Sequence, residues 1–168
     1  MDNIFNNLFN RRRRNPEEGY LLKEDEPVKP SAPKKLTLEV VTTTWTCLEK
    51  VLESREGKRL FYNFLQTEHS VSNLCFYCHV VILQKTATDI SEKCRIVYDE
   101  FLSVESKCQV SMSAADYANI ANILNSGTEH ANMYDEIQQK VLAEMQADAY
   151  PRFLSSEIYK KFVESLKK

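Results

Sequence analysis

The sequence predicts an all-α protein, and three observations support this fold class. From Trp45 to the end of the chain, apolar residues recur at the spacing of amphipathic helices. The β-branched run at residues 40–44 has strand propensity, but no second run pairs with it, and one strand cannot make a sheet. Residues typical of helix caps and breaks separate the apolar stripes. We therefore expect a bundle of seven to nine helices.

Apolar stripes define most of these helices in order along the chain. Their residues are Trp45, Leu48, Val51 and Leu52; Leu60, Phe61, Phe64 and Leu65; 74–83; Ile90, Cys94, Val97, Tyr98, Phe101 and Leu102; Tyr134, Ile137, Val141, Leu142 and Met145; and Ile158, Tyr159, Phe162 and Leu166. The segment 74–83 is apolar nearly all round, which predicts a central buried helix. A further alanine-rich helix is expected from the Ser113–Asp116 cap through Leu124.

Caps and breaks are predicted between the stripes. The expected signals are a stop at Gly57, an N-cap at Ser70, capping boxes at Asp89–Glu92 and Ser113–Asp116, a break at 125–128, and Pro151 in the first turn of a short helix.

Composition excludes several classes of protein. The net charge of −2 gives no global field for nucleic acid, and three scattered glycines cannot build a phosphate-binding loop. We find neither a membrane-spanning apolar run nor a secretory signal. A cytoplasmic location is expected, where the five cysteines are thiols rather than disulfides.

The N-terminal residues differ from the rest of the chain. Residues 15–40 are proline-rich and charged, which predicts a disordered linker before a domain at 41–168. Residues 1–14 combine one apolar helix face with four consecutive arginines. These residues are Ile4, Phe5, Leu8 and Phe9, followed by Arg11, Arg12, Arg13 and Arg14. Such a segment suits peripheral binding to an anionic plasma-membrane surface; a solvated tail and a nuclear-localisation signal are the other interpretations.

A Cys75-x-x-Cys78-His79 sequence matches the spacing of haem attachment, half a zinc site or a thiol redox pair. Its helical context, and the lack of a second such pair, favour core thiols and a helix histidine instead. We expect no metal and no cofactor. His69 and His130 are interpreted as loop residues.

Two junctions carry most of the remaining information, at 60–77 and 145–159. In each, one apolar helical pattern stops, polar residues follow, and a new pattern begins. Residues 45–163 resemble the domain of regulators of G-protein signalling, the RGS domain. Glu68 and Asn73 are among the matching positions, and the most specific part of the resemblance is the tail Met145, Asp148, Tyr150, Arg152-Phe-Leu154, Ser156 and Tyr159.

This resemblance implies a helical bundle of two subdomains that acts on the Gα subunit of a heterotrimeric G protein. Such domains hold the switch segments of Gα and accelerate GTP hydrolysis, while Gα supplies its own catalytic arginine and glutamine. The chain is then not an enzyme with its own active site. The implied Gα-binding residues are Glu68, Ser72, Asn73, Asn122, Asn125, Asp148, Ala149 and Arg152. Asn122 and Asn125 are alternatives for one loop asparagine, and Asp148 and Arg152 are spaced to pair with each other.

The sequence departs from the family pattern at several positions. Val71 and Ser72 stand where two acidic residues are usual, Tyr77 replaces a tryptophan, and Ala149 replaces a serine. The alternative function is therefore a scaffold of the same fold that binds a partner without accelerating hydrolysis. A helical redox or metal protein is a third interpretation, carried by Cys75, Cys78 and His79 alone.

Overall fold

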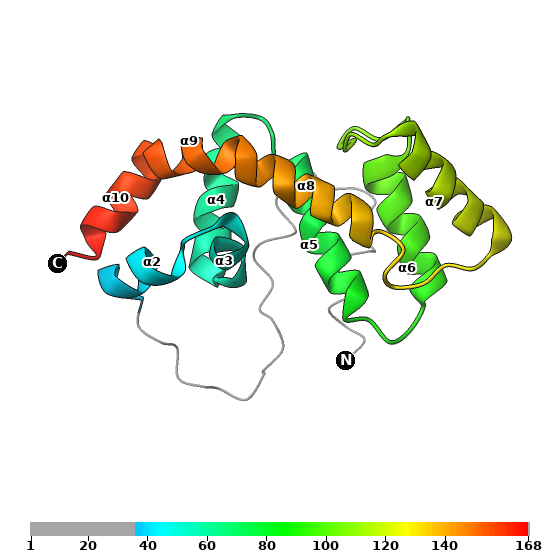
Figure 1. Cartoon of the computed structure of the whole chain (residues 1–168), viewed down its shortest axis with the longest axis horizontal. Coiled ribbons are helices and arrows are strands. Elements are labelled where there is room, and N and C mark those ends of the chain that lie inside the picture. The colour runs from blue at the N-terminus through cyan, green and yellow to red at the C-terminus, as the bar shows by residue number, and fades with distance from the viewer. Residues whose placement is uncertain (1–35, 168) are drawn as a thin grey trace. The chain divides into compact units, whose positions relative to one another are not determined.

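The computed structural model describes residues 36–167, and Figure 1 shows these residues as helices joined by turns and loops. Their α-helices are α2 (Leu38–Thr44), α3 (Leu48–Glu53), α4 (Arg55–Thr67), α5 (Ser72–Gln84), α6 (Ile90–Val97), α7 (Ala114–Ser126), α8 (Asp135–Ala147), α9 (Ala149–Ser155) and α10 (Glu157–Ser165). A π-helical turn, η2 (Tyr98–Leu102), continues α6. No strand occurs in the described residues, so the all-α prediction is confirmed.

The predicted membrane-binding segment, residues 1–14, lies outside the described residues, as do residues 15–35 of the predicted linker. Helix α2 begins at Leu38, within the last residues assigned to that linker. The run at 40–44 is therefore helical despite its strand propensity. None of the helices within 36–167 is long and apolar enough to cross a membrane.

The chain divides into two compact units. The described part of the first unit is 71–143, and that of the second is 36–70 with 144–167. Helix α8 begins in the first unit and ends in the second.

An aromatic cluster forms the core of the second unit. Phe153 of α9 is fully buried and packs edge-on against Phe61 of α4, with ring centroids 5.3 Å apart, and against Tyr159 of α10 at 5.2 Å. Trp45 stacks on Phe162 at 5.5 Å, and its carbonyl accepts a hydrogen bond of 2.9 Å from the Tyr150 hydroxyl. These contacts attach α9 and α10 to the helices that precede them.

Gly57 has a different role from the predicted helix stop. Helix α3 ends before Ser54, whose hydroxyl caps α4, and Gly57 lies in the first turn of α4. A Cβ atom at this position would meet the Val51 carbonyl oxygen at 2.4 Å and Trp45 at 3.0 Å. The glycine is needed because two backbone segments approach closely there, a constraint that spacing along the chain does not reveal.

In the first unit, α5 packs one face against α6 and η2. Phe76 contacts the rings of Phe101 and Tyr134, and the Tyr134 hydroxyl donates to the Cys94 carbonyl at 2.7 Å. The buried residues of α5 are Leu74, Cys75, Phe76, His79, Val80 and Leu83. The prediction of a central buried helix is thus correct for one face, whereas the opposite face is half-buried.

One of the predicted helix caps is present and two are absent. Ser113 and Asp116 form the predicted capping box of α7, and Gly127 ends that helix in the left-handed region. The box at Asp89–Glu92 is wrong, because Asp89 has φ 54° and its side chain makes no cap bond. Ser70 is not the N-cap of α5 either, since Val71 occupies that position.

Candidate functional site

The turn after α4 is tight and is closed by backbone hydrogen bonds, which set the position of Glu68. The Ser70 N–H donates to the Leu65 carbonyl at 3.0 Å, and the His69 N–H donates to the Gln66 carbonyl at 3.2 Å. This pair of bonds is a Schellman motif, which requires a left-handed residue, here His69 with φ 53°. Ser70 belongs to this motif, which explains why it does not cap α5.

The α8–α9 junction places Asp148 at a break between two helices. Pro151 has no N–H to donate to the carbonyl of the residue four positions earlier, so α8 cannot continue through it. Asp148 lies between Ala147 and Ala149, with φ −110° and ψ −64°, and its side chain does not cap α9. That side chain is 70% exposed and thus available to a partner.

Arg152 connects these two junctions within the second unit. Its Nε and Nη2 atoms each donate to a Glu68 carboxylate oxygen at 2.9 Å, and its Nη1 atom donates to the Asp148 carboxylate. Nη1 also contacts the Asp148 carbonyl at 3.2 Å. These bonds raise the pKa of Arg152, the bond to Glu68 contributing most. All three guanidinium nitrogens of Arg152 donate hydrogen bonds, and these bonds orient the carboxylates of Glu68 and Asp148.

The predicted Asp148–Arg152 pair is therefore present, and it is part of a larger cluster. The bond between Arg152 and Glu68 joins residues 84 positions apart, which spacing in one sequence cannot indicate. A bidentate arginine–carboxylate pair has a defined geometry, so the cluster presents its acidic groups in a fixed arrangement.

The other predicted residues of this region lie at the first turns of α5 and α9. Ser72 and Asn73 are the first two residues of α5 and are half-buried. Val71, at the N-cap, is 5% exposed, and Ala149, the first residue of α9, is 6% exposed. Val71 and Ala149, two positions where the sequence departs from the family pattern, are thus buried. The half-buried Asn73 keeps its polar side chain near the start of α5. That Asn73 and Asp148 belong to one docking face remains a prediction.

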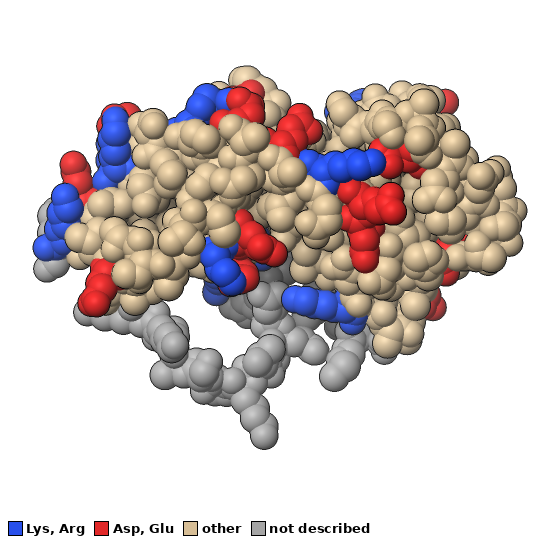
Figure 2. All heavy atoms as spheres, viewed as in Figure 1, with Lys and Arg blue, Asp and Glu red and all other residues tan. Residues whose placement is uncertain are grey.

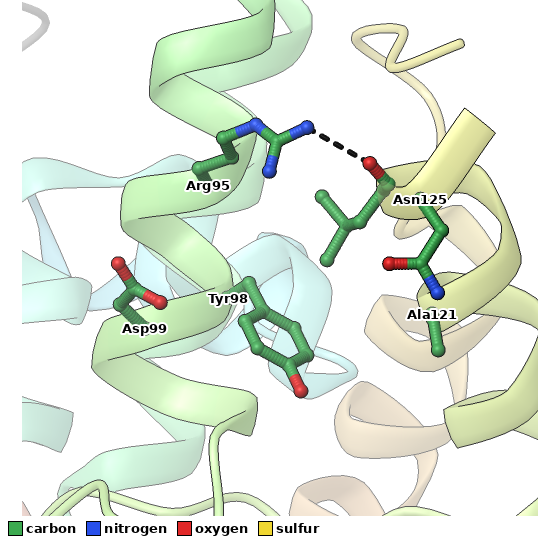
Figure 3. Close-up of a pocket in the computed structure, with 6 residues that line it drawn as sticks. Arg95, Tyr98, Asp99, Ala121 and Asn125 are labelled. Atoms are coloured by element: carbon green, nitrogen blue, oxygen red, sulfur yellow. Dashed lines mark hydrogen bonds between the residues drawn. The ribbon is translucent and has the colours of Figure 1, made fainter. Parts of the chain in front are cut away.

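Asn122 and Asn125 lie on a helix, not in the loop for which they were proposed. Both are exposed on α7, and Asn125 lines an open hollow of about 270 Å³ between α6–η2 and α7. Figure 3 shows Arg95 reaching across this hollow toward the Leu124 carbonyl, at 2.8 Å, while Tyr98 points into it. The Tyr98 hydroxyl lies 3.0 Å from that of Tyr117, and this bond contributes most to raising the Tyr98 pKa to about 12.

Of the Cys75, Cys78 and His79 group, Cys75 and His79 are buried as expected, whereas Cys78 is half-buried, so the expectation of two core thiols is correct only for Cys75. His79 is 1% exposed, and its Nδ1 atom lies 2.8 Å from the Cys75 carbonyl oxygen. Its ring packs at a tilt against that of Phe101, with centroids 4.8 Å apart, and burial lowers the pKa of His79 to about 4. Within residues 36–167, no three His, Cys, Asp or Glu side chains are arranged to hold a metal ion.

Comparison with known proteins matches the same region. The family model described as the regulator of G protein signaling domain matches residues 47–162. The chain belongs to this family. It is 37% identical over 126 residues to "Regulator of G-protein signaling rgs-2" of Caenorhabditis elegans, covering 74% of this chain and 73% of that protein.

Two further relatives carry related names. The chain is 32% identical over 132 residues to "Regulator of G-protein signaling 20" of Homo sapiens, covering 77% of this chain and 34% of that protein. It is 30% identical over 141 residues to "Regulator of G-protein signaling 5" of Rattus norvegicus, covering 83% and 77%. The chain thus spans only about a third of the human relative.

Charges are interspersed rather than segregated over the face shown in Figure 2. Several are paired locally, as in Lys50–Glu53 at 2.8 Å and Lys160–Glu157 at 3.3 Å. The candidate site in the second unit differs from these one-to-one ion pairs, because Arg152 pairs with two carboxylates, those of Glu68 and Asp148. We infer that this cluster has spare acceptor capacity for a partner's N–H groups.

Proposed function

We propose that this RGS protein binds the α subunit of a heterotrimeric G protein and accelerates its GTP hydrolysis. The observation that carries the proposal is the Glu68–Arg152–Asp148 cluster, in which one guanidinium fixes two carboxylates at helix junctions. Carboxylates held in this way suit the backbone N–H groups of a loop. Because the chain belongs to the RGS family, we expect these N–H groups to come from the switch segments of Gα.

The proposed mechanism requires no catalytic group from this chain. Gα already holds an arginine in cis and a glutamine that orients the attacking water. A partner that holds the switch segments in their transition-state geometry lowers the barrier, provided that it binds this geometry better than the ground state. The Asn73 amide both donates and accepts, which suits contact with switch residues.

Single-turnover GTP hydrolysis by a panel of Gα subunits tests the proposal. We expect wild-type protein to accelerate at least one of them and to bind Gα with a transition-state mimic better than Gα with GDP. Asn73→Ala should lower the acceleration about tenfold to hundredfold, the effect of losing a contact of roughly 1–3 kcal/mol. Asn119→Ala, on the exposed side of α7, is the matched control and should change nothing.

The alternative is an RGS-fold scaffold that binds a partner without accelerating hydrolysis. The observation that favours it is the burial of Val71, an apolar residue where a carboxylate is usual in the family. Under this alternative, transition-state-mimic and GDP-bound Gα would bind equally. Equal binding together with unchanged hydrolysis rates would replace the first proposal by this one.

A further inference from the structure

The half-buried face of α5 is apolar over its middle turns, between Asn73 and Gln84. Tyr77, Cys78, Val81 and Ile82, which we call the α5 stripe, follow the spacing i, i+1, i+4, i+5 and share one side of the helix. Helix α5 contains no Asp, Glu, Lys or Arg. A helix that is apolar nearly all round is normally covered on both sides.

Carboxylates adjoin both edges of the α5 stripe. On one edge, Glu100 Oε2 lies 3.7 Å from Nε2 of His79. On the other, the Gln84 amide donates to the Asp135 carboxylate at 2.9 Å. Residues 71–143 contain nine Asp and Glu against five Lys and Arg, so this segment has a net charge of −4. The surroundings of the stripe therefore favour an occupant that is apolar and basic.

The chain itself contains a segment of this chemistry. Ile4, Phe5, Leu8 and Phe9 have the same i, i+1, i+4, i+5 spacing as the α5 stripe, and Arg11–Arg14 follow them directly. The segment 4–14 contains no Asp or Glu. Its apolar residues match the stripe, and its arginines match the flanking carboxylates.

The intervening chain is long enough for this contact. Residues 15–35 span roughly 25 Å as a flexible coil and up to about 70 Å when extended. The radius of gyration of a folded chain of this length is only about 15 Å. Reach therefore does not prevent an intramolecular contact.

We propose that residues 4–14 dock on the α5 stripe as an intramolecular cover. The apolar side chains of the segment then lie against Tyr77, Cys78, Val81 and Ile82, with the arginines beside Glu100 and Asp135. The same apolar face cannot enter a lipid bilayer while it is docked. Docking is thus exclusive with the membrane binding expected for this segment, and anionic lipid would release it.

The thiol of Cys78 reports on this contact in the full-length chain. Maleimide labelling, read residue by residue by mass spectrometry, should be slow at Cys78 in the wild type. Phe5→Asp combined with Phe9→Asp should raise the rate roughly tenfold by shifting a local opening equilibrium. Cys47, in the other unit, should label at an unchanged rate, and fully buried Cys94 reports global unfolding. A matching rise at Cys94 counts against local docking.

Two further experiments test the contribution of charge to docking and the release of the segment by lipid. Glu100→Gln should also speed labelling of Cys78, whereas Glu105→Gln, the same change at an exposed site, should not. Phosphatidylserine vesicles should speed labelling of Cys78 in the wild type. Equal labelling rates in the wild type and the Phe5/Phe9 variant would overturn the proposal. So would vesicle binding with no change at Cys78, which would leave the segment as a membrane anchor only.

Discussion

At the residue scale, Gly57 is the position where packing leaves no room for a side chain. A Cβ atom there would lie 2.4 Å from a backbone oxygen of Val51, and backbone cannot move aside easily. Gly57→Ala should therefore destabilise the protein by roughly 1–3 kcal/mol, as overpacking does. Helix propensity alone predicts the opposite sign, a gain of about 1 kcal/mol. Urea unfolding distinguishes the two, and a more stable variant would refute the close approach.

His79 should make stability depend on pH. Its pKa falls from 6.5 to about 4 because burial disfavours the charged imidazole. Between these values the unfolded chain binds a proton that the folded chain does not, so the free energy of unfolding falls as the pH falls. At pH 5 the loss is about 2 kcal/mol relative to neutral pH.

Urea unfolding of Glu100→Gln, and of Glu100→Gln combined with His79→Leu, at pH 7 and pH 5 measures this effect. Contributions from carboxylates away from the ring are common to both proteins, and Glu100, whose Oε2 lies 3.7 Å from Nε2 of His79, is replaced by Gln in both. The protein that retains His79 should lose more stability than the His79→Leu variant on acidification. Parallel losses would mean that the folded protein accommodates a protonated His79.

Single residues also mark the limit of sequence-based prediction. Pro151 and the Ser113–Asp116 box were predictable because their effects involve only neighbours along the chain. The sequence predicts a helix stop at Gly57, which is wrong. The role of this glycine depends on its neighbours in space, Val51 and Trp45, which come from an adjoining helix and turn and cannot be identified from spacing. Asp89 was assigned as a cap because composition does not reveal a positive φ.

At the scale of elements, α7 depends on its ends more than on burial. Of its 13 residues, Asp116 and Ile120 are buried. The Ser113 hydroxyl caps its first turn at 3.1 Å, and the Lys140 ammonium of α8 contacts Asp116 at 2.6 Å. The bond to Lys140 contributes most to lowering the Asp116 pKa. The capping box and this ion pair therefore hold the helix in place, together with the bonds that Arg95 and Tyr98 make to α7.

Ser113→Ala should loosen α7 without affecting α8. Loss of a helix N-cap costs about 1 kcal/mol, so amides of α7 should exchange with solvent several-fold faster. Ser126→Ala, which removes an exposed hydroxyl at the other end of α7, is the control. Hydrogen exchange by mass spectrometry gives the comparison, and equal exchange in both variants would mean that packing of Ile120 suffices.

The candidate site shows the same division between local and distant information. The Asp148–Arg152 pair follows from four-residue spacing on a helix. The Glu68–Arg152 pair depends on how α9 packs on α4 through Phe153, and periodicity carries no such information. The loop assignment of Asn122 and Asn125 was wrong because α7 continues to Ser126, stopped only by the left-handed Gly127.

At the scale of the whole molecule, the proposed function requires residues of both units to meet one partner. Asn73 belongs to the first unit and Asp148 to the second. A Gα subunit with ordered switch segments should therefore slow amide exchange in 68–73 and in 148–152 together, with the same dependence on its concentration. The GDP form, whose switches are less ordered, should slow neither at that concentration.

Amides of α2 are the internal control, because no residue of α2 belongs to the proposed docking face. If one partner surface bridges the two junctions, a substitution at either junction weakens the same complex. Asn73→Ala should therefore reduce the protection of 148–152, and Asp148→Ala that of 68–73, at a fixed concentration of Gα. Protection of a single junction, or a loss of protection confined to the substituted junction, would show that the two junctions act as separate sites rather than one docking face.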